Sequence, residues 1–226
     1  MREPARYAAR VAPVDLYVPR FAAEPPQEGL PYGRWAERLG QELLAACLAL
    51  ADAHDAELGS EGLGEPGEIV WYPDRSWHGH TYVPATASTA AGYELFGYVR
   101  FVSPGEDGAE PAQLTAHVDF TDQTAAENPG WTLDLCDEVV GRWRGEDGAV
   151  AAMTLVWGRP LVGGGSTAVA ELSELAVDRC ALIENRFTLL APDDYRGHLL
   201  EIELLSPRGK ELARESLYEG EGEGEE

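Results

Sequence analysis

The spacing of apolar residues divides the chain into a short helical part and a long β part. Between Tyr32 and Leu58 apolar residues recur every three or four positions, and polar residues, many of them acidic, occupy the positions between them. This period predicts one amphipathic helix, which Gly59 can end. The inward-facing stripe of this helix consists of Trp35, Leu39, Leu43, Cys47, Leu50 and His54.

After Gly67 the pattern changes to short apolar or alternating runs separated by clusters of turn-forming residues. Many short strands between regular turn signals are typical of an antiparallel β-sandwich or a flattened barrel. We expect two sheets, with the helix covering an open face or edge. The expected strands are residues 68–72, 81–84, 92–102, 113–120, 131–135, 138–144, 149–157, 168–177, 180–190, 198–205 and 211–218.

The stretch from Glu68 to Val102 is the richest in aromatic residues. Its 35 positions hold eight of the twenty aromatic residues of the chain. Large aromatic side chains bury more apolar area than any others, so we expect this stretch to lie across the middle of the core. Its members beside Pro73 and Pro84 lie in turn-like surroundings, and we expect them nearest the surface, in a protein interface or a ligand site. These candidates are Tyr72, Trp77 and Tyr82.

The last hairpin has a clear turn signal. Ser206, Pro207 and Gly209 occupy the first, second and fourth positions of a tetrapeptide, which are the positions that these residues prefer in a type I turn. We therefore expect a strand on each side of this turn. A short helix from Lys210 to Tyr218 is the alternative for the second strand.

The two ends of the chain differ in composition from the part between them. Residues 1–31 are rich in Arg and Pro and predict an extended arm, in which Val14–Val18 alternates as a short edge strand. The arm can reach onto a neighbouring subunit, lie along its own domain or be disordered. Residues 219–226 are five Glu and three Gly and predict a disordered acidic tail. We expect residues 32–218 to form one domain.

The charge balance narrows the classes of partner. Forty acidic and seventeen basic residues give a net charge of -23, which repels nucleic-acid phosphates and anionic lipids. No apolar run is long enough to span a bilayer, and no signal peptide is evident. The basic residues are Arg apart from Lys210, which suggests a GC-rich bacterial coding sequence, although a salt-adapted source would also favour an acidic surface. We expect a cytoplasmic protein without nucleic-acid or membrane partners.

The cysteines favour a reducing compartment. Cys47, Cys136 and Cys180 are odd in number and far apart, and no CxxC spacing occurs. This pattern argues against a disulfide framework and against a zinc site. We expect reduced thiols, most of them buried.

Two histidine motifs are candidate metal ligands. His78 and His80 have the spacing that places both rings on one face of a strand, and His117 with Asp119 repeats it. Two facing strands could bring these four side chains into a cage for a divalent metal ion. The alternative is that they are solvent-facing strand residues. A calcium site among the acidic residues between 119 and 138 is weaker, because no DxDxDG spacing supports it.

The sequence contains no catalytic motif. No serine lies in a GxSxG elbow, and the glycine run before Ser166 lacks the lysine of a phosphate-binding loop. We therefore predict a non-catalytic protein without a cofactor that acts through protein–protein association, as an adaptor or an assembly component, in a homo-oligomer or with another protein. The competing hypothesis is a metal-dependent enzyme or small-molecule-binding barrel with its site around His78, His80, His117 and Asp119.

Overall fold

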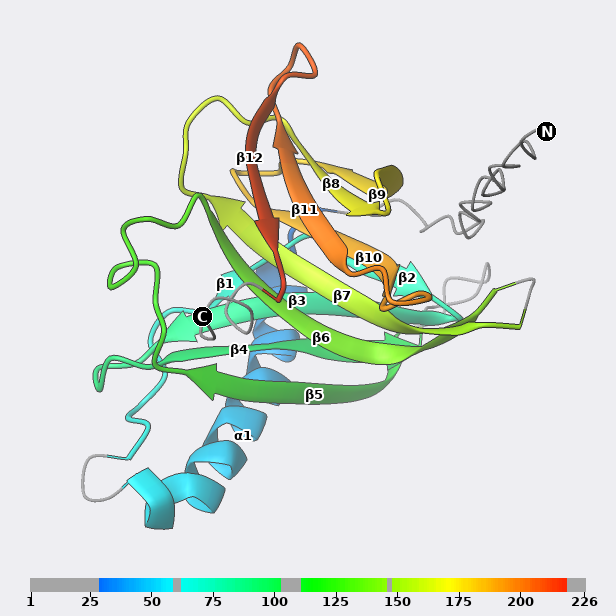
Figure 1. The fold of residues 1–226 in the computed structure, drawn as a ribbon. Coiled ribbons are helices and arrows are strands. Elements are labelled where there is room, and N and C mark those ends of the chain that lie inside the picture. Colours follow the sequence, from blue (N-terminus) through cyan, green and yellow to red (C-terminus); the bar gives the residue numbers. More distant parts are fainter. Residues whose placement is uncertain (1–28, 59–61, 103–110, 146–147, 219–226) are drawn as a thin grey trace, which may run out of the picture.

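The computed structural model describes residues 29–58, 62–102, 111–145 and 148–218. Within them the chain forms one helix followed by antiparallel strands (Figure 1), so the mainly β fold with a helix near the N-terminus is confirmed. Residues 1–28, which include the expected strand Val14–Val18, and the acidic tail 219–226 lie outside the described residues.

The strands form three sheets. The first sheet has the order β1-β3-β4-β5, with β2 also paired to β3. The middle sheet has the order β10-β7-β6, and the third has the order β12-β11-β8-β9. The elements are α1 (Gly33–Leu58), β1 (Val70–Trp71), β2 (Arg75–Trp77), β3 (His80–Ser88), β4 (Glu94–Val102), β5 (Ala112–Thr121), β6 (Leu133–Arg144), β7 (Val150–Pro160), β8 (Thr167–Leu172), β9 (Leu175–Ala181), β10 (Phe187–Asp193), β11 (Leu200–Leu205) and β12 (Glu211–Ser216).

Helix α1 covers the outer face of the first sheet. Leu39, Leu43 and Cys47 from the predicted stripe are buried against Val83 and Val99 of the sheet. The edge of the Trp35 ring meets Phe101, with ring centroids 5.1 Å apart. The apolar stripe of the helix therefore packs against the alternating apolar residues of β3 and β4, and together they form one layer.

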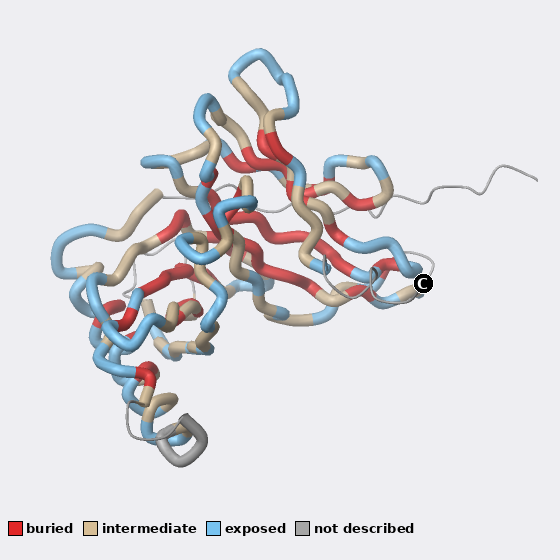
Figure 2. The backbone as a smooth tube through the Cα atoms, turned by 60° about the vertical axis from the view of Figure 1, so that its left-hand side comes forward, coloured by how far each residue is buried: buried red, intermediate tan, exposed pale blue. Residues whose placement is uncertain are grey.

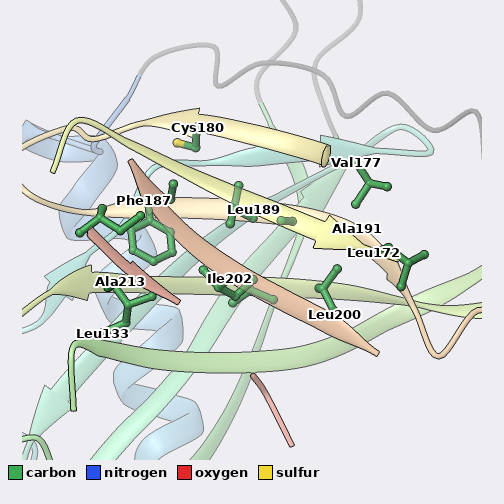
Figure 3. Close-up of a cluster of buried hydrophobic side chains, with 14 of the residues drawn as sticks. Leu133, Leu172, Val177, Cys180, Phe187, Leu189, Ala191, Leu200, Ile202 and Ala213 are labelled. Atoms are coloured by element: carbon green, nitrogen blue, oxygen red, sulfur yellow. The ribbon is translucent and has the colours of Figure 1, made fainter. Parts of the chain in front are cut away.

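The middle sheet lies between two apolar layers. Met153, Leu155 and Trp157 of β7 pack with Tyr82 and Tyr98 of the first sheet. On the other face of the middle sheet, β7 and β10 pack against the third sheet. Figure 3 shows the main side chains of that second layer, which include Leu133, Leu172, Val177, Phe187, Leu189, Leu200 and Ile202.

The aromatic-rich stretch lies in the interior as expected, but it shares this position with the middle sheet. The aromatic-rich stretch 68–102 builds most of the first sheet, whose strand β3 is buried at every residue from Thr81 to Ala87 between α1 and the middle sheet. Strands β7 and β10 of the middle sheet are also covered on both faces. Figure 2 shows such buried segments running through the interior of the molecule. A strand buried on both faces needs apolar residues at nearly every position, and the runs Ala151–Trp157 and Phe187–Ala191 have that composition. The third sheet was not predicted because these continuous runs were interpreted only as ordinary strands.

Several strand boundaries also differ, because some turns contain no glycine at their bends. The expected strand 168–177 is two strands, β8 and β9, joined through Ser173 and Glu174 at φ 53° and 64°. The expected strand 180–190 breaks in the same way at Glu184 and Asn185. Positive φ at two successive residues is the geometry of a tight hairpin turn, which usually selects Gly or Asn.

Strands β3 and β6 are longer than expected. Strand β3 continues past Pro84 because the carbonyl of Pro84 accepts a hydrogen bond from the backbone N–H of Tyr72 at 2.9 Å. Pro84 has no backbone N–H and so donates no hydrogen bond on this side of β3, which is where the break between β1 and β2 occurs. Strand β6 unites two expected strands, because its pairing with β7 runs without a break from Leu135 to Glu138; a bulge follows between Val139 and Gly141.

The last hairpin is confirmed. Gly209 donates its backbone N–H to the carbonyl of Ser206 at 2.9 Å, and β12 pairs with β11 from Glu211 onward. The alternative helix does not form. All three cysteines carry free thiols, of which Cys47 and Cys180 are buried.

Candidate functional site

The predicted four-residue metal cage does not form. His80 lies opposite Val102 on β4, whereas His117 lies opposite Tyr98, so strand geometry separates the two histidines by roughly 16 Å. His78 is a turn residue at φ 51°, so the His78–His80 pair is not extended and loses the shared face that a strand provides. No group of three or more His, Cys, Asp or Glu side chains in the described part of the chain could hold a metal ion.

His117 and Asp119 share one face of β5, as the alternation predicts. Both side chains are exposed, and the His117 ring stacks on Tyr98 with centroids 5.6 Å apart. Glu138 of β6 lies near them. Burial raises the pKa of Glu138, the nearby His117 lowers it, and Asp119 raises it. These residues lie on β5 of the first sheet and β6 of the middle sheet.

The predicted aromatic surface cluster is not formed. Tyr72 and Tyr82 are 4% and 2% exposed, because the β1–β3 segment places them between the first and middle sheets. Burial is the main cause that raises the pKa of both phenols. Trp77 is half-buried and covers Gly141, where an added Cβ would meet the Trp77 ring at 2.4 Å. Of the three aromatic candidates, only Tyr72 lines a described cavity.

A polar cavity of about 310 Å³ lies at one end of the first and middle sheets. Residues from the five strands β1, β3, β4, β6 and β7 and from the segments on either side of β1 meet there. Its polar side chains include the hydroxyls of Tyr72 and Thr86, which are 3.4 Å apart. Its charged side chains are Glu68, Glu94, Asp134 and Arg159.

The charges in this cavity are unequally paired. Arg159 donates its Nε–H to Asp134 Oδ2 at 2.9 Å, and Asp134 is only 8% exposed. Glu94 is half-buried, and its carboxylate makes no hydrogen bond or ion pair to any other described residue. Burial raises the pKa of Glu94, Asp134 raises it further and Arg159 lowers it. The thiol of Cys136 lies within electrostatic range of these groups, and burial raises its pKa well above the ordinary value.

Sequence reasoning missed this cavity. Glu94, Asp134 and Arg159 lie on three strands and have no characteristic spacing in the sequence. Only the pairing of β3 with β4 and of β6 with β7 brings them to the same end of two facing sheets. Each of them also looks like an ordinary surface residue in a chain with forty acidic side chains.

The outer edge of β5 is a second candidate site. From Thr115 to Thr121 the pairing of β5 with β4 is regular, and Asp119 is the only carboxylate in the strand (Figure 1). Natural proteins protect sheet edges with charges, prolines, bulges or short strands. Strand β5 has no proline in its ten residues and no bulge in this part.

The other described sheet edges are better protected. Strand β6 carries a bulge and five charged residues, β12 has six residues of which three are charged, and β1 has two residues. Side chains cover the edge of β10, since Thr188 O accepts from Arg75 and Leu190 N donates to Asp178. Strand β9 has a bulge in its pairing with β8 and two charged residues, and the carbonyl of Arg179 accepts from Arg75. Strand β5 is therefore the least protected long edge of the described strands.

Two further cavities lie among the described residues. One of about 630 Å³ adjoins Gly29–Tyr32, where the described part of the chain begins. The other, of about 270 Å³, lies between Trp131 and Leu217 and includes Asp137. Neither combines a half-buried carboxylate that lacks a partner with several hydroxyls, as the Glu94 cavity does.

Comparison of the chain with protein-family models, with curated proteins and with solved structures found no match. No helix among the described residues has both the length and the apolar character needed to cross a membrane.

Proposed function

We propose that the protein acts through protein–protein association, as a homo-oligomeric assembly component in which an extended segment of one copy pairs with β5 of another. The observation that carries this proposal is the long, regular and weakly protected edge of β5. An exposed edge strand is a ready template for strand addition, because its outward N–H and C=O groups can pair with another backbone. In this proposal the protein is non-catalytic, bacterial and cytoplasmic.

The segment that fits this edge best is Val14–Val18 of the N-terminal arm. Its apolar residues Val14, Leu16 and Val18 alternate with Asp15 and Tyr17, and prolines at both ends limit it to five residues. Paired with β5, one side of this segment extends the apolar row that packs against α1. That row consists of Leu114, Ala116, Val118 and Phe120.

Charge favours the same pairing. The first twenty residues contain four Arg and two acidic residues, whereas the β5–β6 side carries Asp119 and Glu138. Opposite charges bring the segment to the edge and oppose other orientations. Gly29 lies beside Ile183, near β1, and β1 and β5 are at opposite ends of the first sheet. An arm that extends to a neighbour does not need to fold back across its own sheet.

The test is light scattering on size-fractionated protein. We expect the wild-type chain to form a defined oligomer, and we expect Leu16→Lys and Thr115→Lys to dissociate it, because a lysine at either position places a charge in the paired strands. Leu199→Lys is the matched control, since Leu199 is exposed at a distant turn. A wild-type protein that is monomeric at all concentrations, or an oligomer that both variants retain, would contradict the proposal.

A further inference from the structure

The Glu94 cavity is built like a binding site and not like a gap between sheets. Its volume of about 310 Å³ is at the lower end of the range for small-molecule sites. Two of its polar residues, Tyr72 and Asp134, are more than nine-tenths buried, at 4% and 8% exposed. Polar groups held this far from solvent are normally paired, and here Tyr72 pairs with Thr86 and Asp134 with Arg159 along the cavity wall.

We propose that this cavity binds a small organic cation through a primary ammonium group, which is held by Glu94 with the hydroxyls beside it. The Glu94 carboxylate is a hydrogen-bond acceptor that no other described residue pairs with. Glu94 is the first residue of β4 and lines the cavity. An ammonium group offers three N–H donors, which suits a carboxylate surrounded by hydroxyl oxygens.

The sign of the charge selects this class of ligand. Three carboxylates, Glu68, Glu94 and Asp134, face one cation, and that cation, Arg159, is already bound to Asp134. An anionic ligand would meet an uncompensated negative field, whereas a cation neutralises Glu94 and relieves its repulsion by Asp134. Because burial raises the pKa of Glu94, binding of a cation should strengthen as the pH rises through that pKa.

The donor set distinguishes an ammonium ligand from a metal ion or a quaternary amine. The described carboxylates are not grouped closely enough to hold a metal ion. Recognition of a quaternary ammonium usually relies on a cage of aromatic faces, and Tyr72 is the only aromatic residue that lines this cavity. A primary ammonium with directional N–H donors fits the oxygen atoms that are present.

The inference is tested by calorimetric titration of the full chain with 1,4-diaminobutane in about 150 mM NaCl, which screens weak binding to the acidic surface. We expect saturable binding at one site, and we expect Glu94→Gln to weaken it by about tenfold or more because a charge-assisted hydrogen bond is lost. Tyr72→Phe removes a single hydroxyl and should weaken binding less. Glu174→Gln is the matched control, since Glu174 is exposed in the turn between β8 and β9.

Three outcomes would overturn the inference. The first is non-saturable binding or no binding by the wild-type chain. The second is equal binding by Glu94→Gln and Glu174→Gln, which would assign the binding to the general surface charge. The third is equal binding of the uncharged 1,4-butanediol, or Mg²⁺ binding with the same dependence on Glu94. Circular dichroism of each variant confirms that it is folded, and Tyr72→Phe provides an independent test if Glu94→Gln is not.

Discussion

The Arg75 side chain is 1% exposed and connects all three sheets from its position on β2. It donates hydrogen bonds to the carbonyl of Thr188 on β10 and, at 3.0 Å, to Asp178 Oδ2 on β9. The same Asp178 oxygen accepts from the backbone N–H of Leu190 at 2.9 Å. Burial raises the pKa of Asp178, and Arg75 opposes that shift. The ion pair thus satisfies backbone groups that the edge of β10 would otherwise leave unpaired.

We expect Arg75→Met to lower the free energy of unfolding by about 3–5 kcal/mol, because it leaves Asp178 buried without its cation. Urea unfolding followed by tryptophan fluorescence measures this loss. Arg142→Met is the control, since Arg142 is exposed on β6 and its loss should change stability by less than about 0.5 kcal/mol. A loss below about 1 kcal/mol for Arg75→Met would show that the pair does not hold the sheets together.

At the scale of the elements, the close approach of strands β4 and β5 depends on one glycine. A Cβ added at Gly97 would lie 2.0 Å from the carbonyl oxygen of His117 and 2.9 Å from the Cα of Val118. Both neighbours are backbone atoms of β5, which cannot move without breaking the strand pairing. Gly97 is therefore fixed by a strand that is adjacent only in the folded protein.

We expect Gly97→Ala to lower the free energy of unfolding by about 1–3 kcal/mol or more, because the new methyl group forces β4 and β5 apart. The matched control is Gly163→Ala, since no atom lies within 4 Å of a Cβ at Gly163. That substitution should leave stability unchanged or raise it by about 0.4–1 kcal/mol. The result that contradicts this account is an equal effect of the two substitutions in urea unfolding.

The presence of a strand was more predictable from the sequence than the residues at which the strand begins and ends. The alternation in β5, β11 and β12 and the Ser-Pro-Arg-Gly turn predicted those strands well, because each signal is local. The hairpins at Ser173–Glu174 and Glu184–Asn185 were missed, because residues other than glycine adopt positive φ there. The pairing of the flanking strands imposes the positive φ angles on these residues at a cost in conformational energy. The local sequence preference of the residues does not predict this conformation.

Over the whole molecule, negative charge is the dominant electrostatic feature. The net charge is -23, and every described carboxyl group with a resolved shift has its pKa raised. The pKa of Asp137 rises to about 6 through burial and through repulsion by Glu138 and Asp193. A carboxyl with a higher pKa in the folded state than in the unfolded chain binds protons more tightly when folded.

We therefore expect stability to fall as the pH rises from about 4 to about 7, since the contribution of these protonated carboxyls is lost as the pH passes their folded-state pKa values. Asp137→Asn should reduce this pH dependence by about 1 kcal/mol, a value discounted because Asp137 lies at the surface and the burial of its carboxyl is incomplete. Urea unfolding at several pH values measures it, with the exposed turn residue Asp122, changed to Asn, as the control. A wild-type stability that rises over this pH range would contradict the expected sign.

The sequence by itself determined the helix, the β class, the final hairpin and the acidity, because each depends on the spacing or the composition of residues close together in the chain. Only the tertiary structure decided that the strands form three sheets, that β7 and β10 lie between the other two, and that β5 is left as an open edge. It also decided which polar residues meet, since it separated His80 from His117 and brought Glu94, Asp134 and Arg159 together. The physical reason is that strand pairing and sheet stacking act between distant segments, whose register no local pattern encodes.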